Sequence, residues 1–326
     1  MFVNSWFNKG SCMALIQAPN SVVMVRPWKF FSNPETAVDN AFQKTGLDEQ
    51  DSLELDRTGI SLQAKNEFDI VVAGLNENGI NVHVFDDFGD RETPDSVFPN
   101  NWFSTHGGGH VALYPMFSQN RRRERRSDII EMLKAHYRVQ DVIDFSGLEW
   151  DNVFLEGTGA MVLDNVNRIA YTAKSNRSSE VILERFCAIF QYEPMAFETA
   201  DATGTAIYHT NVMMCVASKY ALICLDMIPN EARRAAVRQR LEESDIEVIE
   251  LSFDQIDNFA GNAIELTGNG QSHLVMSQRA RDALTADQVA RIEQHSKILG
   301  FSVPTIELAG GSIRCMIAGI HLSPRT

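Results

Sequence analysis

The feature that most limits the fold of this chain is an internal repeat. Short apolar segments typical of β-strands begin near Asn101, Glu156, Asn211, Asn262 and Cys315, and neighbouring positions in this series lie 51 to 55 residues apart. We call these five positions the unit anchors. A repeat of this length indicates supersecondary units that bury their apolar faces against one another, as in arrays and rings.

Each unit has the same predicted order of strand, strand, helix and strand. The predicted first strands are 101–105, 154–164, 211–217, 262–268 and 314–320, and the second strands are 110–115, 168–173, 220–226 and 272–277. Apolar residues at three- and four-residue spacing then predict helices at 121–137, 179–191, 230–243 and 286–299. The segments VQDVIDFS, PMAFETA, IEVIELSF and VPTIELA read as the third strands.

The fifth unit has only its first strand at the C-terminus, so residues 21–85 must supply its other elements. The two ends of the chain would then close a ring, which removes exposed sheet edges. We therefore expect an α+β fold in which five ββαβ units form one domain over residues 21–326, preceded by a loose extension over residues 1–20. The first strands would line the ring axis and bring the unit anchors to one opening.

Charge and cysteine content restrict the partners of the chain. The formal net charge of −14 opposes general binding to nucleic acid or anionic membranes and suits a small cationic or zwitterionic ligand. No apolar run reaches the roughly 18 residues that a membrane helix needs. Five irregularly spaced cysteines without a CxxC pair indicate reduced thiols in a cytoplasmic protein. The sequence leaves open whether the chain forms a homodimer.

Cys315, His209 and Glu156 are side chains that together could carry out catalysis. A thiolate is the attacking form of cysteine, and a histidine can protonate a leaving amine and then activate water. Glu156 could orient the imidazole or hold a substrate nitrogen. Each residue also has a plain structural interpretation, because single cysteines and histidines on apolar strands are usually core residues. The residues alone do not decide between the two.

Several short segments resemble motifs of one enzyme superfamily, in family order from about residue 22 to 321. GGSIRCM resembles the terminal cysteine motif of arginine deiminases, FLEGTG the E-G-G-D strand, and YHTNVMM the His-x-Asp element. TPDSVFPNNW is similar to the P-D-x-x-F-x-E-D loop of dimethylarginine dimethylaminohydrolase, and AKSNRSS to the S-x-R-T segment. The chain thus resembles the pentein superfamily, an α/β-propeller fold, and within it most of all the citrulline-utilisation hydrolases.

The resemblance implies a covalent mechanism. Cys315 would attack the central carbon of a guanidine-like group of an amino-acid substrate and form an adduct. His209 would act as general acid and then as base, while Glu156 would hold a substrate nitrogen and support His209. Neither a metal nor an organic cofactor would be needed.

The resemblance also implies substrate contacts. Asp95 matches the aspartate of the P-D-x-x-F loop, and Arg177 matches an arginine that would pair with a substrate carboxylate. A second arginine comes from the run NRRRERR, where the register leaves both Arg121 and Arg122 as candidates.

Four positions depart from the family pattern. Asn101 and Asn211 replace aspartates, Asn100 replaces a glutamate, and Gly159 replaces the last residue of E-G-G-D. A carboxylate only accepts hydrogen bonds, whereas an amide donates and accepts. We therefore expect Asn101 and Asn211 to bind a neutral ureido group such as that of citrulline, with ornithine, ammonia and carbon dioxide or carbamate as products. A neutral substrate would not, however, favour ionisation of the thiol as a cation does.

Other interpretations remain open at this stage. An amidinotransferase would pass the adduct to an amine instead of water, and an inert ring could serve as a binding scaffold. In THGGGH, His106 and His110 could hold a metal, but the glycines favour a hairpin turn. The arginine run at 121–126 could bind phosphate, although the acidic overall charge favours a solvated helix start.

Overall fold

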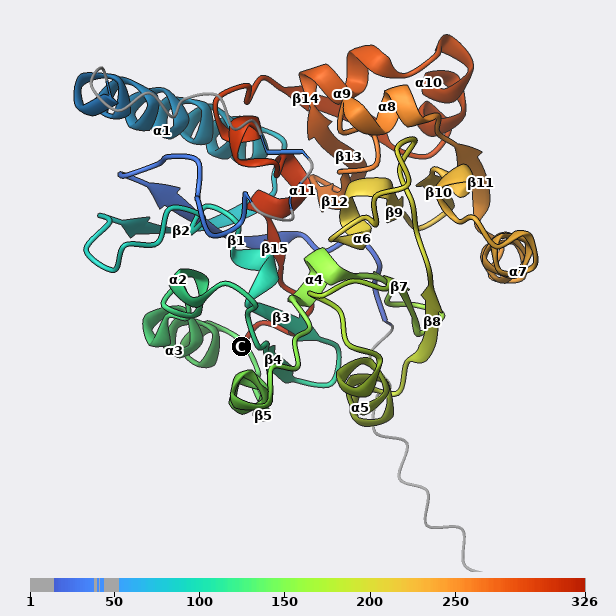
Figure 1. The fold of residues 1–326 in the computed structure, drawn as a ribbon, viewed down its shortest axis with the longest axis horizontal. Coiled ribbons are helices and arrows are strands. Elements are labelled where there is room, and N and C mark those ends of the chain that lie inside the picture. Colours follow the sequence, from blue (N-terminus) through green and yellow to red (C-terminus); the bar gives the residue numbers. More distant parts are fainter. Residues whose placement is uncertain (1–14, 38–39, 41, 44–52, 326) are drawn as a thin grey trace, which may run out of the picture.

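The computed structural model describes residues 15–37, 40, 42–43 and 53–325. Their strands form five three-stranded sheets arranged around a common axis (Figure 1). In every sheet the middle strand pairs antiparallel with the first strand and parallel with the third. The predicted ring of five ββαβ units is therefore confirmed.

The four units that are continuous in sequence follow one another around the ring. Their strands are β3 (Phe103–His106), β4 (His110–Leu113) and β5 (Asp141–Asp144); β6 (Met161–Asp164), β7 (Ile169–Ala173) and β8 (Glu193–Phe197); β9 (Met214–Val216), β10 (Tyr220–Ile223) and β11 (Glu247–Glu250); and β12 (Ile264–Gly268), β13 (Gln271–Ser277) and β14 (Lys297–Phe301).

The fifth unit joins the two ends of the described chain. β15 (Ala318–Gly319) pairs antiparallel with β1 (Ser21–Pro27), and β1 pairs in parallel with β2 (Asn81–Asp87). The long helix α1 (Leu53–Glu77) makes the crossover between β1 and β2. The ring closure that the repeat predicted is thus present at the level of strand pairing, because main-chain hydrogen bonds tie the last strand to the first.

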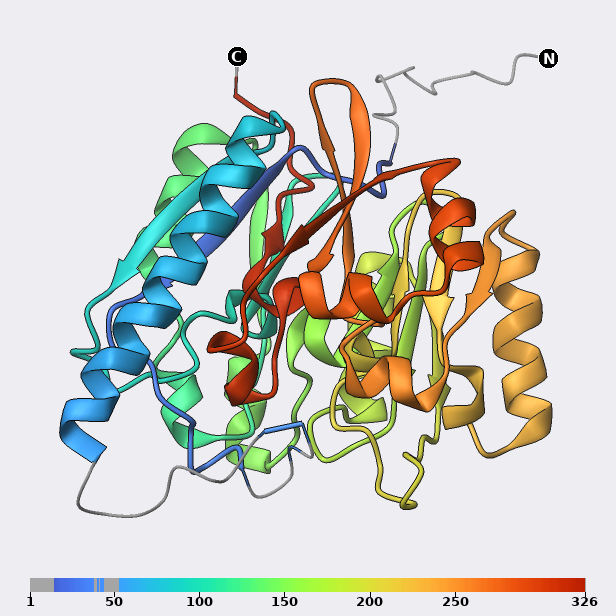
Figure 2. The ribbon, with the colours of Figure 1, turned by 90° about the horizontal axis from the view of Figure 1, so that it is seen from above.

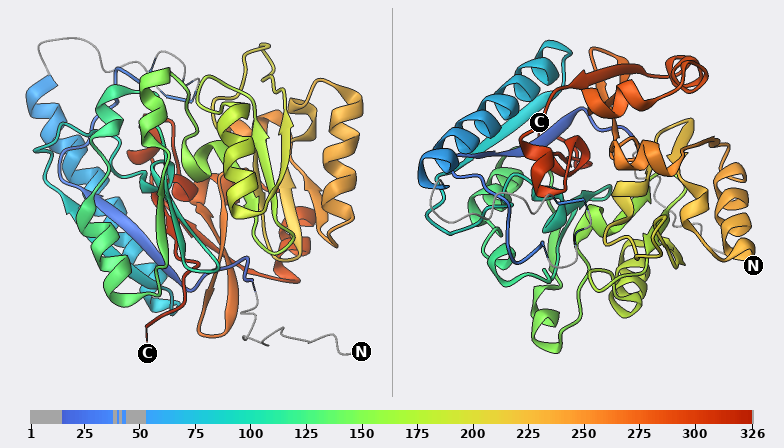
Figure 3. Two further views of the ribbon diagram at one scale, coloured as in Figure 1. Left: turned by 90° about the horizontal axis from the view of Figure 1, so that it is seen from below. Right: turned by 45° about the horizontal axis from the view of Figure 1, so that its top comes forward.

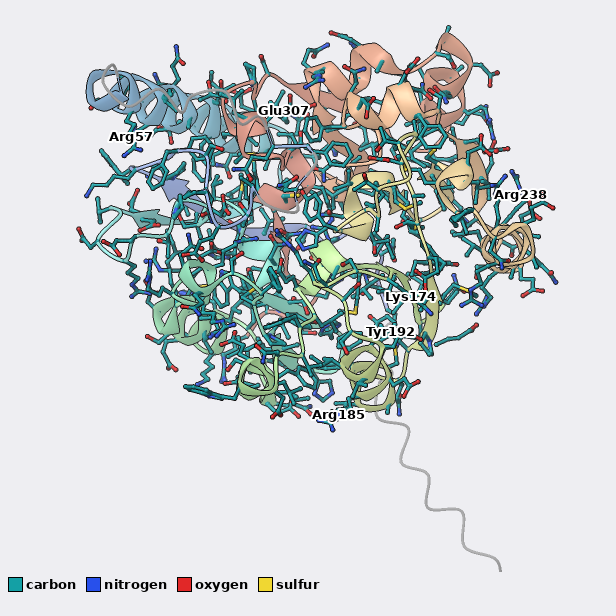
Figure 4. The ribbon with its side chains drawn as sticks, in the orientation of Figure 1. Arg57, Lys174, Arg185, Tyr192, Arg238 and Glu307 are labelled. Atoms are coloured by element: carbon teal, nitrogen blue, oxygen red, sulfur yellow. The ribbon has the colours of Figure 1, made fainter. Side chains whose placement is uncertain are left out.

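Helices cover the outside of the ring. The longer ones are α3 (Ser127–His136), α5 (Glu180–Phe190), α7 (Glu231–Glu242) and α10 (Ala286–Glu293), and α8 (Phe253–Asp257) and α9 (Gln278–Ala283) accompany the fourth unit. On α5, the side chains of Ile182, Phe186 and Phe190 are buried against the sheet at four-residue spacing. Polar side chains such as Arg185 on α5 and Arg238 on α7 lie at the periphery (Figure 4).

Local sequence signals explain several helix starts. The Asn230 side chain accepts a hydrogen bond from the backbone N–H of Arg233 at the start of α7. Thr285 and Gln288 form a capping box at the start of α10. The predicted end of this helix is wrong, since α10 stops at Glu293 and residues 297–301 form β14 beside β13. The segment predicted as the third strand of this unit instead contains the 3-10 turn η4 (Ile306–Ala309).

The unit anchors also differ from the prediction, because most of them precede their first strand on a single helical turn. These turns are η1 (Pro99–Asn101), α4 (Gly157–Ala160), α6 (Thr210–Met213) and α11 (Ile313–Met316), and the remaining short elements are α2 (Gln119–Arg122), η2 (Ser146–Asp151) and η3 (Leu225–Met227). At α4 the backbone enters the turn through Gly157, whose φ of 47° is left-handed and suits glycine. The turns contact one another near the centre of the ring (Figures 1 and 3).

The N-terminal segment is more ordered than predicted where the structure describes it. Residues 1–14 of the expected loose extension lie outside the described residues. Residues 15–20, in contrast, are tied to the ring: the Gln17 side chain donates hydrogen bonds to the carbonyls of Leu163 and Val216 and accepts one from the backbone of Asn165. The chain passes over the end of the ring from which the C-terminus emerges (Figure 2), so loose packing is wrong for these six residues.

Candidate active site

A small cavity opens at the end of the ring where α11, α6 and η1 meet. Its lining includes Asp95, Asn101, Arg121, Arg177, His209 and Cys315. These residues come from four of the five units, so only the closed ring brings them together. Thr36 and Asn40 line the same cavity, and Asn40 donates a hydrogen bond to the carbonyl of Ala309.

His209 and Glu156 form a buried pair beside the cavity. His209 Nε2 lies 2.8 Å from Glu156 Oε2, and both side chains are almost fully buried. Burial alone would raise the pKa of Glu156, but the charge of Arg177 and the hydrogen bond from His209 outweigh it and hold the pKa well below its usual value. An ionised carboxylate only accepts hydrogen bonds. His209 Nε2 therefore carries the proton, and Nδ1 is left to exchange a proton with a ligand.

Burial also sets the charge state of His209. Desolvation lowers its pKa, while the hydrogen bond and charge of Glu156 oppose that shift. The imidazole is consequently neutral at neutral pH. Its Nδ1 can therefore accept a proton from a thiol or from water. Glu156 remains in place as the acceptor that stabilises an imidazolium once it forms.

Two arginines neutralise this buried carboxylate. Arg177 Nη1 lies 3.6 Å and Arg121 Nη1 3.9 Å from Glu156 Oε2. Arg121 also makes a two-point ion pair with Glu124, at 2.9 Å and 3.0 Å, and donates to Asn101 Oδ1 at 2.9 Å. This fork geometry is specific to a guanidinium group. Both arginines line the cavity, so each is placed to meet an anionic group of a ligand.

The sulfur of Cys315 lies between two side-chain amides. Asn211 Nδ2 and Asn262 Nδ2 are each 3.3 Å from Sγ and point donors at it. Within the described part of the chain, Asn211 Oδ1 is buried and has no hydrogen-bond partner. Because buried polar groups are normally satisfied, this oxygen is an acceptor available to a ligand next to the thiol.

In Asn101 the atom without a partner is the amide donor, whereas in Asn211 it is the acceptor. Its Oδ1 accepts from Arg121, and since a guanidinium cannot accept a hydrogen bond, this contact fixes the orientation of the amide. Its Nδ2 is buried and without a partner among the described residues. A Cβ at Gly159 would lie 2.1 Å from this nitrogen and 2.9 Å from His209 Nδ1. The glycine that departs from the family motif therefore makes room for the amide beside the histidine.

Asp95 supplies a carboxylate at another wall of the cavity. Its Oδ2 accepts from Asn33 Nδ2 at 2.7 Å and from Thr36 Oγ1 at 3.3 Å, and Arg121 Nε lies 3.7 Å away. Burial raises its pKa, although the charge of Arg121 lowers it in part. Its Oδ1 has no partner within the described residues, so Asp95 can accept a hydrogen bond from a cationic ligand group.

Of the two arginines that the sequence left open, Arg121 lines the cavity and Arg122 does not. The Arg122 guanidinium donates to the carbonyls of Met116 and Phe117 and lies 3.6 Å from Glu149. Of the two open candidates for a substrate contact, the geometry therefore favours Arg121 over Arg122. The two neighbours face opposite sides because adjacent residues on the helical turn α2 are about 100° apart.

This difference gives a matched pair of variants. We expect Arg121→Lys to lower kcat/KM by about 10- to 100-fold, because lysine keeps the charge but loses the fork to Glu124 and Asn101. Arg122→Lys should stay within about twofold, since its contacts are to main-chain carbonyls outside the cavity. Steady-state kinetics on both variants, with unfolding midpoints as a check of folding, test the assignment. The reverse order of effects would contradict it.

The sequence missed some residues of the site. Asn262 is a unit anchor, so its position in the repeat could have placed it at the axis beside Cys315. Asn33 and Thr36 contact Asp95 from a segment without any repeat or motif signal. Such a contact between distant segments cannot be predicted without the tertiary fold.

The alternative metal site at THGGGH is not formed by this geometry. β3 and β4 make the predicted hairpin, in which His106 pairs with His110. His106 Nε2 bonds to Ser104 and its ring packs on Phe190, while His110 Nδ1 bonds to Asp141. No group of three or more histidine, cysteine, aspartate and glutamate side chains suited to a metal ion occurs in the described residues. The described helices also include none with the length and apolar character of a membrane span.

Comparison with solved structures finds the same fold. The N-terminal domain of ArgZ, an arginine dihydrolase from the ornithine-ammonia cycle in cyanobacteria, matches with a TM-score of 0.70 and 15% identity over 93% of this chain and 99% of that one. Unliganded AgrE matches with a TM-score of 0.71 and 16% identity over 94% of this chain, which spans only 40% of AgrE. An adduct of a dimethylarginine dimethylaminohydrolase variant with S-methyl-L-thiocitrulline gives 0.60 and 12%, over 92% and 99%.

Sequence comparison identifies the family, although no curated protein matches the chain. The family described as N,N dimethylarginine dimethylhydrolase, eukaryotic, matches residues 26–322 and so covers most of the sequence. The predicted superfamily is thereby confirmed. The chain belongs to this family of pentein-fold, cysteine-dependent hydrolases of arginine-like guanidino compounds.

Proposed function

We propose that, within this family, the chain hydrolyses a C–N bond in the ureido group of a citrulline-like amino acid. The single observation that carries the proposal is a pair of buried amide atoms without a partner among the described residues: Nδ2 of Asn101 on the cavity lining, and Oδ1 of Asn211, whose Nδ2 contacts the Cys315 sulfur. One is a donor and the other an acceptor. A neutral ureido group needs both kinds of partner, whereas a guanidinium offers only donors.

The charged groups of the site suit the two ends of an amino acid. Arg121 and Arg177 can bind a carboxylate, and the free oxygen of Asp95 can accept from an ammonium group. The ureido group would then lie between Asn101 and Asn211, next to the Cys315 sulfur. Asp95 is then the only carboxylate on the described lining, with Glu156 beside it on His209, to meet a cationic side-chain end.

The proposed reaction has two stages. The Cys315 thiol passes its proton to His209 Nδ1 and its sulfur attacks the ureido carbon; the C–N bond then breaks, and the leaving amine takes that proton from Nδ1. His209 Nδ1 then removes a proton from water, which attacks the carbon bound to sulfur and releases the thiolate. Glu156 stays ionised and holds the imidazole throughout, because its 2.8 Å hydrogen bond stabilises the protonated form.

A guanidino substrate is the second candidate, and two observations favour it. The matched family is named for dimethylarginine, and ArgZ is named an arginine dihydrolase. An arginine-like substrate would use Asp95 and Glu156 as its acceptors. Transfer of an amidino group to an amine is a third outcome of the same adduct. The convergence of Cys315, His209 and Glu156 at one cavity argues against an inert scaffold.

We test the proposal with a panel of citrulline, arginine and dimethylarginine, measuring ammonia release and the amino-acid products. Citrulline turnover with ornithine as product is the expected result. Turnover of arginine or dimethylarginine with no attack on citrulline would overturn the ureido assignment while leaving the hydrolase class intact. Added glycine or lysine separates transfer from hydrolysis, because only transfer yields a new guanidino product.

The cellular setting is part of the same proposal. Cys187, Cys215, Cys224 and Cys315 are unpaired thiols in the described chain, which suits a reducing cytoplasm. The acidic net charge suits a small zwitterionic substrate better than nucleic acid or an anionic membrane. We retain residues 21–326 as one domain, since the pairing of β15 with β1 joins its two ends.

A further inference from the structure

A neutral ureido substrate leaves one requirement unmet. A cationic substrate favours the thiolate form of a nearby cysteine by its charge, and a ureido group carries no charge. The protein must then stabilise the Cys315 thiolate with its own groups. The surroundings of the sulfur therefore show how the cysteine becomes reactive before substrate binds.

Asn262 is the side chain on the sulfur that the mechanism has not used. It lies just before β12, is fully buried, and points Nδ2 at Cys315 Sγ over 3.3 Å. The same nitrogen donates to the carbonyl of Asn211 at 3.1 Å, so both of its hydrogens have acceptors. Its Oδ1 accepts from the backbone N–H of Arg314 at 3.0 Å.

These contacts fix the orientation of the Asn262 amide. A backbone N–H can only donate and a carbonyl can only accept, so rotating the amide by half a turn would place like groups against both partners. Nδ2 must therefore face the sulfur. A hydrogen bond from a neutral donor is strengthened when its acceptor is charged, so this contact favours the thiolate over the thiol.

The contacts of Asn262 also connect three units. It links the turn before β12 to α6 through Asn211 and to α11 through Arg314. Asn211 shares the task of donating to the sulfur, but its free Oδ1 is directed to the substrate. The polar atoms of the Asn262 side chain all have partners in the sulfur and the main chain, so none is left for the substrate.

Charged and titratable groups of both signs lie around the sulfur, and the arginines outnumber the carboxylate of Asp95. Burial lowers the pKa of Arg314 to about 10, which still leaves the guanidinium charged at neutral pH, and its Nη1 donates to the carbonyl of Ile317. Burial raises the pKa of Tyr208, so this neighbour stays neutral. The other charged or titratable groups of the described cavity lining are His209, Arg121, Arg177 and Asp95.

We propose that Asn262 is a positioning residue that orients the Cys315 sulfur and stabilises its thiolate, so that the nucleophile is active without a cationic substrate. This inference explains how the proposed ureido hydrolysis can begin. The role of Asn262 in catalysis rests on that proposed function. Its test does not, because the reactivity of the thiol can be measured without any substrate.

The test is the rate of Cys315 alkylation by iodoacetamide, an uncharged reagent whose carbon bonds to sulfur as iodide leaves. Asn262→Asp is close in shape but has no donor when ionised, and Asn262→Ala loses the donor without adding a charge. Both should slow alkylation at neutral pH by about tenfold or more, and leave the rate unchanged in alkali, where the thiol is ionised in every form. kcat should fall in parallel with little change in KM.

Controls separate this role from a structural one. Asn258→Asp, at a half-buried amide four residues earlier that contacts Arg279 and the Asp254 carbonyl but not the sulfur, should react like the wild type. Peptide mapping shows which cysteines have been alkylated. Only preparations in which the buried Cys187 and Cys215 stay unlabelled are compared, since a loosened fold would expose both thiols. Equal neutral rates in the wild type and both variants would overturn the proposal. Slowing in Asn262→Asp alone would also overturn it, because charge rather than the donor would then be the cause.

The two proposals fail separately. Slowed alkylation together with no citrulline turnover in the wild type would retain Asn262 as a positioning residue and reject the ureido substrate. Alkylation that is unchanged in the variants, together with full citrulline turnover in the wild type, would reject Asn262 as a positioning residue and retain the ureido substrate.

Discussion

Replacing Cys315 with alanine is expected to lower turnover at least about 10⁴-fold while the protein keeps its fold. The sulfur lies at the axial end of the ring between two amide donors and lines the cavity with His209. No other described thiol lines this cavity. Without the sulfur, no covalent adduct can form, and only binding and the His209–Glu156 pair remain.

The cost to stability should be small by comparison. Cys315 is buried, but the change removes one atom and leaves two amide donors without their acceptor, which we expect to cost about 1 to 3 kcal/mol. Circular dichroism and thermal unfolding check this expectation. Loss of folding would show instead that the sulfur serves the structure.

Cys215→Ala is the matched control. Cys215 is also buried, on β9, and burial raises the pKa of its thiol to about 12, so it is not a nucleophile at neutral pH. Its replacement should leave kcat within about twofold. Full activity in Cys315→Ala, or equal loss in both variants, would remove the covalent mechanism.

The second large effect concerns substrate choice. The double variant Asn101→Asp/Asn211→Asp should lose at least about 100-fold in kcat/KM for citrulline relative to arginine. The change removes the Asn101 donor and the Asn211 donor to sulfur and adds two carboxylates to the cavity. A guanidinium would neutralise these charges, whereas a ureido group would leave buried carboxylates uncompensated.

The measurement is the ratio of kcat/KM for the two substrates in the wild type, both single variants and the double variant. Asn76→Asp on the exposed face of α1 adds a carboxylate away from the site and should leave the ratio unchanged. An unaltered ratio in the double variant would show that these amides do not set the choice of substrate. A lower rate for both substrates without a change in the ratio would show that Asn211 acts only through its hydrogen bond to the Cys315 sulfur.

Some features of the site followed from the sequence because they are periodic. The unit anchors recur every 51 to 55 residues, and a residue that recurs once per unit in a ring returns to the axis. That reasoning placed Asn101, Glu156, Asn211 and Cys315 at one opening. It also held for Asn262, which the motifs did not flag because asparagine there matches no catalytic pattern.

Other features depended on contacts between distant segments. The register of NRRRERR left two arginines equivalent, and only the packing of α2 against η1 turns Arg121 toward Asn101 and Arg122 away from it. The helix predicted over 286–299 ends early because residues 297–301 satisfy their main-chain groups by pairing with β13. Local propensity does not contain that pairing.

Repetition along the chain determined the ring, its closure by the two ends and the set of residues that face its axis, because a periodic pattern carries that information in the order of residues alone. The orientation of each amide, the pairing of His209 with Glu156 and the two donors on Cys315 came from the three-dimensional arrangement. Hydrogen bonds act over about 3 Å. Whether a side chain makes one depends on neighbours that are dozens to hundreds of residues away along the chain.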